Sequence, residues 1–342
     1  MNGTESTLGV GVAALDHDLH LARTLEAVDA VLAEAKLVPV SRTVVSADGS
    51  REAERVAREH GWHLRWLPAG SPRTLASARE AARRAAAAEL VLLVDGDVEP
   101  AIGWLPRAHD KLLSTSLVAG VGGQVDEAHW SHGALVGSRR DVYGAGSGRT
   151  VSALHDVALW RNPALEAVGG FDPWLPSEDE VELGARLGQA GLSLVALGTT
   201  AGTRHGPPLG SLEDLRHRLS GGRLNGPGLV LTRARGTSLF GGHVLRYRWE
   251  IFAFLWLVAG VVTGGLARAG DYYWVWLSAS AGILVALAVL RTSLSRAFWG
   301  ALLAVAHGLG IARNLVLPAQ PRKTGPPPRP ASGSAPGAAS GP

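Results

Sequence analysis

The chain has 342 residues, a formal net charge of +3 and no cysteine. This length is enough to bury an α/β core, and the absence of cysteine excludes disulfides, thiolate metal sites and a cysteine nucleophile. No basic stripe is interleaved with aromatic residues, so we predict no nucleic-acid partner. The N-terminus has no basic segment before its short apolar run, and we expect no signal peptide.

The N-terminal part alternates between short apolar runs and helical patterns. Strands are predicted over residues 8–15, 42–46, 63–67 and 90–94, with helices over 19–35, 50–58 and 75–88 between them. Such alternation is typical of βαβ units and a mostly parallel sheet. Gly9 and Gly11 lie inside the first strand, and Ala14 replaces the third glycine of a dinucleotide motif, so nicotinamide binding is disfavoured.

The fourth predicted strand ends in two aspartates. The apolar run 90–94 leads directly into Asp95, Gly96 and Asp97. In open α/β sheets ligands bind at the carboxyl ends of the strands, where Gly96 would allow close backbone approach. Two carboxylates there suit a divalent cation that holds a diphosphate, whereas a plain Asp-Gly turn is the alternative interpretation of this segment.

Further chemistry is predicted beyond residue 100. The glycine-rich stretch 120–148 is interpreted as a surface excursion, with a mobile loop over a site as the alternative. Acidic residues gather at 178–182, at the start of a helix that runs through Ala190. They suit the positive end of the helix dipole, which is a structural explanation for them. A last strand over 192–200 is followed by His205.

The order of these segments resembles that of family 2 glycosyltransferases, which have the GT-A fold. The resemblance covers about the first 210 residues, and no single segment is specific on its own. The matching segments are ADGS at 47–50, SARE at 77–80, VDGDVEP at 94–100, VGGFDP at 168–173, DEVELGARL at 179–187 and His205. The chain departs from the family at residues 13–16, where a Pro-x-Tyr-Asn type of segment is common, and at Glu80, where the family has asparagine.

The resemblance implies a nucleotide-sugar donor site. It places Asp48 near the donor base and Arg79 near the base or the diphosphate, with Gly96 in the donor site.

The resemblance also implies a divalent cation, Mn²⁺ or Mg²⁺. It places Asp97 on the metal, Asp95 on the ribose or the metal, and His205 as a further metal or diphosphate ligand.

The general base is predicted in the acidic segment. The family motif aligns with Asp179-Glu180 when counted back from Arg186, whereas the literal Glu-Asp pair is Glu178-Asp179. Either Asp179 or Glu180 is therefore the expected base. A positioned carboxylate that takes the proton of an acceptor hydroxyl contributes roughly 10²- to 10⁴-fold in rate. With the base opposite the leaving group, single displacement with inversion is expected.

The C-terminal third is predicted to be a membrane region. Residues 250–266 and 272–290 are apolar runs long enough for about 30 Å of hydrocarbon, and they form a predicted transmembrane hairpin. Residues 297–316 are interrupted by polar side chains and predict an interfacial helix, with a third span as the alternative. The Pro/Gly/Ala/Ser tail, 318–342, is predicted to be disordered.

These segments give a predicted domain organisation and location. We expect a GT-A domain over 1–231 and a juxtamembrane and membrane region over 232–317. Arginines flank both predicted spans on the same side, which predicts a cytosolic catalytic domain on the inner membrane of a bacterium. The arginines are at positions 233, 235, 246, 248, 291 and 296.

The expected function is an inverting, metal-dependent transfer of a sugar from a nucleotide diphosphate sugar to a hydroxyl group. Because the predicted anchor places the site beside the bilayer, the acceptor is expected to be lipid-linked or membrane-proximal. Transfer to polyprenyl phosphate is one alternative. A non-catalytic, membrane-tethered protein that binds sugar nucleotides is another.

Overall fold

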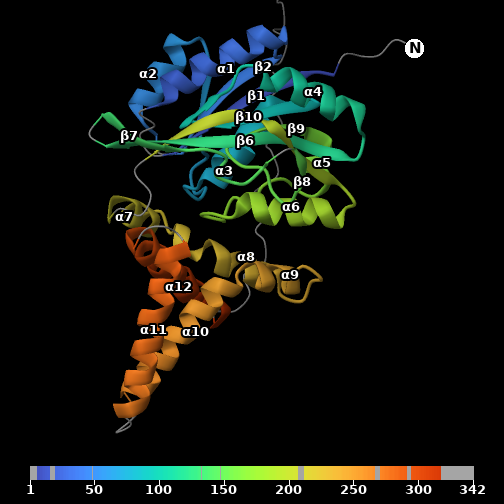
Figure 1. The fold of residues 1–342 in the computed structure, drawn as a ribbon. Coiled ribbons are helices and arrows are strands. Elements are labelled where there is room, and N and C mark those ends of the chain that lie inside the picture. Colours follow the sequence, from blue (N-terminus) through green and yellow to red (C-terminus); the bar gives the residue numbers. More distant parts are fainter. Residues whose placement is uncertain are drawn as a thin grey trace, which may run out of the picture.

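The computed structural model describes residues 6–15, 20–47, 49–131, 133–146, 148–206, 212–265, 270–290 and 294–316. A β-sheet with helices on both faces lies above a group of C-terminal helices (Figure 1). The strands are β1 (Leu8–Ala14), β2 (Ser41–Ser46), β3 (His63–Trp66), β4 (Leu90–Asp95), β5 (Val98–Pro100), β6 (Val118–Ser131), β7 (Ala134–Arg139), β8 (Arg149–Val151), β9 (Val157–Arg161) and β10 (Ser193–Gly206).

The helices fall into two groups. Those around the sheet are α1 (Leu21–Ala35), α2 (Arg51–Glu59), α3 (Leu75–Ala86), α4 (Trp104–Ser114), α5 (Asn162–Ala167) and α6 (Asp179–Gln189). Those below it, here called the helical region, are α7 (Leu212–Ser220), the 3₁₀ helix η1 (Arg223–Asn225), α8 (Gly226–Ala234), α9 (Phe240–Arg246), α10 (Arg248–Gly265), α11 (Gly270–Leu290) and α12 (Leu294–Val316).

The ten-stranded sheet has the order β3-β2-β1-β4-β9-β6-β10-β5, with β7 on β6 and β8 on β10. Strands β3, β2, β1 and β4 are parallel. Strand β9 is antiparallel to both β4 and β6, so β6 and its parallel neighbour β10 run in the same direction as β4. The carboxyl ends of these strands therefore meet at one edge, as the predicted mostly parallel α/β sheet requires.

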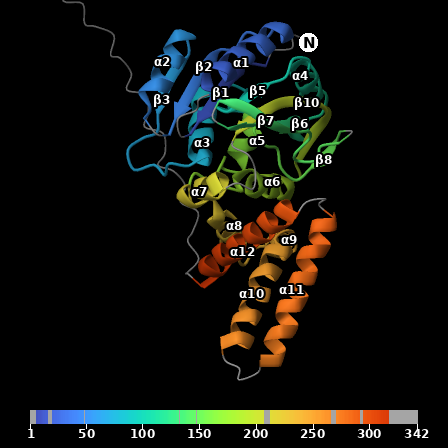
Figure 2. The same cartoon turned by 60° about the vertical axis from the view of Figure 1, so that its left-hand side comes forward.

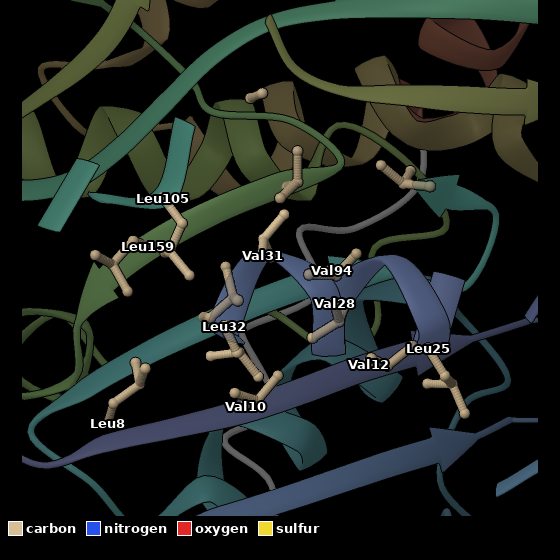
Figure 3. Packing of buried hydrophobic residues seen from close by; sticks show 14 of the residues in the cluster. Leu8, Val10, Val12, Leu25, Val28, Val31, Leu32, Val94, Leu105 and Leu159 are labelled. Carbon is tan, nitrogen blue, oxygen red and sulfur yellow. The ribbon is translucent and has the colours of Figure 1, made fainter. Parts of the chain in front are cut away.

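Both faces of the sheet are covered by apolar packing. On one face, Val10, Val12, Leu92 and Val94 pack against α1, α2 and α4, and Figure 3 shows side chains of α1 against the face formed by β1 and β4. On the other face, α3, α5 and α6 cover β4 and β9. Every residue of β4 is buried, which explains the unbroken apolar run that precedes Asp95.

Glycines in β1 serve helix packing. A Cβ on Gly9 would lie 2.7 Å from the Ala86 side chain, and one on Gly11 would lie 2.8 Å from that of Ala82. Helix α3 thus crosses β1 so closely that only glycine fits. This contact explains both glycines without a dinucleotide.

The glycine-rich stretch 120–148 was predicted as a surface excursion, and this is wrong for most of it. Residues 118–131 form the long central strand β6, and 134–139 form β7. A Cβ on Gly120 would lie 2.6 Å from Trp160, and one on Gly123 would lie 2.5 Å from the Thr199 carbonyl oxygen. The glycines make room for neighbouring groups inside the sheet, which local sequence signals cannot distinguish from a loop.

The helical region lies on the side of the sheet covered by α3, α5 and α6. Helices α10 and α11 run side by side away from the sheet, and α12 crosses between them and α8 (Figures 1 and 2). At this crossing, a Cβ on Gly310 would lie 2.3 Å from the Leu224 carbonyl oxygen, and Arg235 donates a hydrogen bond to the Leu315 carbonyl (2.8 Å). Helix α12 is thereby joined to the elements next to the sheet.

Two of the described helices are long and apolar enough to cross a membrane, over Asp271–Leu290 and Ala297–Val316. None of the first segment is buried, whereas 22% of the second is buried. Helix α10, the first predicted span, does not meet the same criterion over its described residues and begins with the charged Arg248 and Glu250. The tail 318–342 lies outside the part of the chain that the structure describes.

Candidate active site

Asp95 closes β4 beside the start of β9. Its backbone N–H donates to the Asp156 carbonyl (2.8 Å), and Val94 is paired with Val157. The turn that follows is fixed by two more hydrogen bonds: Gly96 N–H donates to the Ala13 carbonyl (2.8 Å), and Thr24 Oγ1–H donates to the Gly96 carbonyl (2.8 Å). The Asp-Gly-Asp segment therefore forms a turn, and its first residue also contacts a charged side chain from another element, Arg79 of α3.

Arg79 on α3 binds three carboxylates. Its Nε and Nη2 donate to the two oxygens of Asp95 (2.9 and 2.6 Å). Its Nη1 lies 2.8 Å from Asp179 Oδ2 and 2.6 Å from Glu180 Oε1. The Arg79 side chain is only 6% exposed. The predicted role of Arg79 in donor binding remains a prediction, because the observed contacts are with the protein's own acids.

Asp179 and Glu180 thus face Asp95 across one guanidinium. Burial and the neighbouring Glu180 raise the pKa of Asp179 well above its usual value, against the opposing effect of Arg79. For Glu180, burial alone would raise the pKa, but Arg79 and the nearby His155 hold it below its usual value. Glu180 is the more exposed carboxylate of the two, and its Oε1 lies 3.7 Å from His155 Nδ1. The pKa of Asp179 is therefore shifted upward and that of Glu180 downward, although both carboxyl groups contact Arg79.

Asp156 is a site residue that sequence reasoning missed. It is 8% exposed, has a left-handed backbone with φ of 62°, and its Oδ2 has no hydrogen-bond partner among the described residues. Burial and the charges of Asp95 and Asp97 raise its pKa well above the usual range. A non-glycine residue at positive φ is uncommon and is held only by its surroundings. The sequence offers no motif that would have indicated it.

Arg204 and Tyr143 stand next to Asp156. Arg204 Nη1 donates to Tyr143 Oη (2.7 Å) and lies 3.6 Å from Asp156 Oδ1. The same arginine forms an ion pair with Glu127 on β6. Sequence reasoning also missed these residues, which come from β10, β6 and the segment before β8.

The carboxylates at this edge fit a divalent cation. Burial and the neighbouring Asp95 raise the pKa of Asp97 to about 6, so the charges here oppose one another without a cation. Asp156 carries a buried carboxylate oxygen without a partner. Buried charges of one sign call for a counter-charge, and oxygen ligands suit Mg²⁺ or Mn²⁺. No three His, Asp or Glu side chains among the described residues form a complete metal cage.

His205 forms a hydrogen bond through one ring nitrogen, and the other is buried without a hydrogen-bond partner among the described residues. Its Nδ1 accepts a hydrogen bond from Trp130 Nε1–H (2.9 Å), and its Nε2 lies 3.0 Å from Glu99 Oε1. The backbone N–H of His205 donates to the Asp97 carbonyl (2.8 Å), so the two predicted metal ligands are neighbours in the sheet. Because Nδ1 is occupied by Trp130, Nε2 is the ring nitrogen that could bind a cation, beside Glu99. Asp48, the remaining predicted donor residue, lies outside the described residues.

A cavity of about 380 Å³ lies near Glu180, which is next to the lining residue His155. It reaches His155 and Tyr143, whose rings are stacked with centroids 4.0 Å apart, and extends to Arg149 and to Arg246 of α9. No carboxylate lines it. The remaining lining residues are Gly122, Gly123, Val125, Ala145, Thr150, Val151, Ser152, Ala153, Leu154 and Ala196.

Comparison with known proteins identifies the fold. No protein-family model matches the sequence, and no curated protein matches it. Among solved structures, the mannosyltransferase PcManGT from Pyrobaculum calidifontis, in complex with GDP-Man and Mn²⁺, aligns over 89% of this chain and 86% of its own, with 17% identity and a TM-score of 0.55. The chain has the GT-A fold.

A second similar structure is glucosyl-3-phosphoglycerate synthase from Mycobacterium tuberculosis, in complex with Mn²⁺, UDP and phosphoglyceric acid. It aligns over 68% of this chain and 80% of its own, with 13% identity and a TM-score of 0.48. In the present chain, the elements of the GT-A sheet are followed by the helical region, and Asp95 lies at the carboxyl end of β4.

Proposed function

We propose that this protein is an inverting, divalent-cation-dependent glycosyltransferase that uses a nucleotide diphosphate sugar. The observation that carries the proposal is the meeting of Asp95, Asp179 and Glu180 on Arg79 at the carboxyl edge of a GT-A sheet. A donor-side acid and an acceptor-side acid pair are thereby held at fixed positions, as displacement at a sugar carbon needs.

On the donor side, Asp97 and Asp156 are the residues that would hold the cation, and Asp95 would be held beside them by Arg79. When bound, a divalent cation stabilises the negative charge that develops on the departing diphosphate. Arg204, next to Asp156, adds a fixed positive charge on the same side of the site. His205, tied to Asp97 through the backbone, remains a further candidate ligand.

On the acceptor side, Glu180 is the proposed base. Its pKa is held low, so it is ionised, and it lies next to His155 at the cavity wall. Asp179 is the more deeply buried acid, and burial together with Glu180 raises its pKa, so Glu180 is the stronger candidate for the ionised base. Glu180 would take the proton from the acceptor hydroxyl as that oxygen attacks from the side opposite the diphosphate, which inverts the anomeric carbon.

The cavity is the proposed acceptor site. It extends from His155, beside Glu180, to Arg246 at the end of α9, next to the helix α10. An acceptor bound there would lie between the catalytic acids and the helical region. This position supports an acceptor that is lipid-linked or close to a membrane.

The proposed location is the cytoplasmic membrane of a bacterium, with the GT-A domain in the cytosol. Large apolar side chains are exposed along α11, among them Trp274, Val275 and Ile283. Exposure of such an apolar surface to water is unfavourable, and lipid would cover it. We propose that α10 and α11 form the spanning hairpin and that α12, joined to α8, lies at the interface.

Transfer to polyprenyl phosphate is a second candidate, favoured by the two arginines and the lack of carboxylates in the cavity lining. A phosphate acceptor is already ionised and needs no base. Glu180→Gln separates the two reactions: transfer to a hydroxyl should fall by about 10²-fold or more, whereas transfer to a phosphate should persist.

The proposed function is tested by nucleoside diphosphate release from UDP-, GDP- and dTDP-sugars, with Mn²⁺ and a membrane extract as acceptor. Wild-type protein should release the diphosphate from one of these donors, and Asp97→Ala should abolish release. Asp110→Ala, on the exposed side of α4, is the matched control and should behave as wild type. Full activity of Asp97→Ala would overturn the assignment, and donor binding without any turnover would indicate a binding protein.

A further inference from the structure

The eight residues before α6 contact both the GT-A domain and the helical region. This junction segment, residues 171–178, ends directly at Asp179 and Glu180. Figure 1 shows α6 facing α8 and α9. On the side of the GT-A domain, the Phe171 N–H donates to Glu80 Oε2 (3.0 Å), and Thr74 Oγ1–H donates to the Pro173 carbonyl (2.7 Å).

On the other side, polar groups of the helical region bind the junction segment at two points. Arg233 of α8 forms an ion pair with Asp172 (Nη1 to Oδ2, 2.9 Å), with side chains only 10% and 0% exposed. Ser177 Oγ–H donates to the Arg223 carbonyl of η1 (2.7 Å). A Cβ on Gly226 would lie 2.0 Å from Ser177 Oγ, so α8 begins against the segment itself.

An apolar contact adds to these bonds. Leu175 is fully buried in a cluster with Val230 and Leu231 of α8, Tyr247, and Ile311 of α12. This cluster contains no residue of the sheet or of its covering helices. Leu175 therefore packs in the helical region, whereas Phe171, at the other end of the segment, is buried in the core of the GT-A domain.

Tyr247 makes the last contact before the catalytic acids. It lies between α9 and α10, and its hydroxyl donates to Glu178 Oε2 (2.9 Å). Glu178 has a left-handed backbone with φ of 64° and immediately precedes α6. Because a non-glycine residue rarely adopts this conformation unaided, its neighbours must hold it, and Glu178 sets the direction in which α6 starts.

We propose that the helical region completes the catalytic site, with Tyr247 and Arg233 as positioning residues that hold the junction segment. Through Glu178 and Asp172, they keep the first turn of α6 where Asp179 and Glu180 meet Arg79. This inference rests on the proposed function of Glu180 as the base. The C-terminal helices then serve catalysis as well as attachment, since the core that fixes the acids includes residues of α8 and α12.

The test uses the full-length protein and removes one hydroxyl. Tyr247→Phe should lower kcat about tenfold while KM for the donor stays unchanged, because the acid pair shifts and the donor side does not. Hydrogen exchange at the amides of residues 179–183 should become faster in the same variant. Tyr272→Phe, at an exposed tyrosine of α11, is the matched control and should change neither quantity.

A double-mutant cycle tests whether Tyr247 acts through Glu178. Glu178→Ala should lower kcat to a similar degree, and the double variant should be no slower than either single variant. The proposal would be overturned if the losses of kcat in the two single variants multiplied in the double variant. It would also be overturned if Tyr247→Phe had the kcat of wild type, or if hydrogen exchange at residues 179–183 were unchanged in this variant. If wild-type protein transfers no sugar at all, the proposed function fails, and the exchange measurement still decides whether Tyr247 holds α6.

Discussion

A single arginine joins the parts of the candidate site. Arg79 is almost fully buried, and its guanidinium contacts carboxylates from β4 and from the start of α6. Removing one partner of a buried ion pair typically costs about 3–5 kcal/mol, because the other charge is left unpaired. The position of Asp95 relative to Asp179 and Glu180 therefore depends on Arg79.

Asp156, in contrast, is a buried acid whose Oδ2 has no hydrogen-bond partner among the described residues. We expect Asp156→Asn to weaken Mn²⁺ binding about tenfold or more, and to stabilise the metal-free protein at neutral pH. Burial and the charges of Asp95 and Asp97 raise the pKa of Asp156 in the folded protein above that of a free aspartate, so its ionisation destabilises the metal-free fold as pH rises. The gain from asparagine should be present at pH 7 and vanish below about pH 4.

Two measurements check this prediction. Mn²⁺ titration followed by electron paramagnetic resonance gives the affinity, and thermal unfolding of the metal-free protein between pH 4 and pH 7 gives the stability. Asp110→Asn on the surface of α4 is the control. Equal Mn²⁺ affinity in Asp156→Asn and wild type would remove Asp156 from the cation site.

At the scale of elements, glycines mark the places where backbones approach closely. They lie in β1 under α3, in β6 beside Trp160 and Leu154, and at the crossing of α8 and α12. A Cβ on Gly228 would lie 2.6 Å from the Gly310 carbonyl oxygen, and the two helices are further joined by Thr232 Oγ1–H, which donates to the Asn314 carbonyl (3.2 Å). Helix α12 therefore has one fixed position against α8.

Replacing Gly310 of α12 should push this helix away from η1, which directly precedes α8. Gly310→Ala places a Cβ 2.3 Å from the Leu224 carbonyl oxygen and should destabilise the protein by about 1–3 kcal/mol. Gly282→Ala in α11 meets nothing within 4 Å and should be neutral or stabilising by up to about 1 kcal/mol. Unfolding of both variants in the same detergent measures the difference. Equal stability of the two would contradict the close crossing.

At the scale of the whole molecule, the GT-A domain is attached to helices that it does not cover. The apolar segment of α11 has no buried residue, although helices of this length and composition are normally covered by protein or lipid. The helices α8, α9 and α12 lie between this exposed hairpin and α6 (Figures 1 and 2). Under the proposed location, Asp179 and Glu180 would lie on the side of the GT-A domain that is nearer to the membrane.

The natural absence of cysteine gives a direct test of this arrangement. Single cysteines introduced by Ser238→Cys, before α9, and Asp271→Cys, at the start of α11, can be labelled with a membrane-impermeant maleimide. In intact bacterial spheroplasts, we expect the Asp271→Cys protein to react and the Ser238→Cys protein to react only after lysis. Labelling of both only after lysis would show that the hairpin does not cross the membrane.

The sequence by itself determined the elements whose signals are local. The apolar run of β4, the helical pattern of α1 and α3 and the acidic start of α6 each follow from periodicity or composition, and they were predicted to within a few residues. The alternation of strands and helices predicted a mostly parallel sheet, and the resemblance of the ordered motifs to family 2 glycosyltransferases predicted the GT-A fold.

Only the tertiary structure decided the partners. The glycines of β6 resemble a loop until Trp160 and Leu154 are seen against them, and Asp156 belongs to no motif. The contacts of Arg79 with Asp179 and of Tyr247 with Glu178 join residues far apart in the chain. Such contacts depend on packing between elements, which leaves no periodic trace in the sequence. The arrangement of the acids, and the part that the C-terminal helices play in it, therefore became visible only in three dimensions.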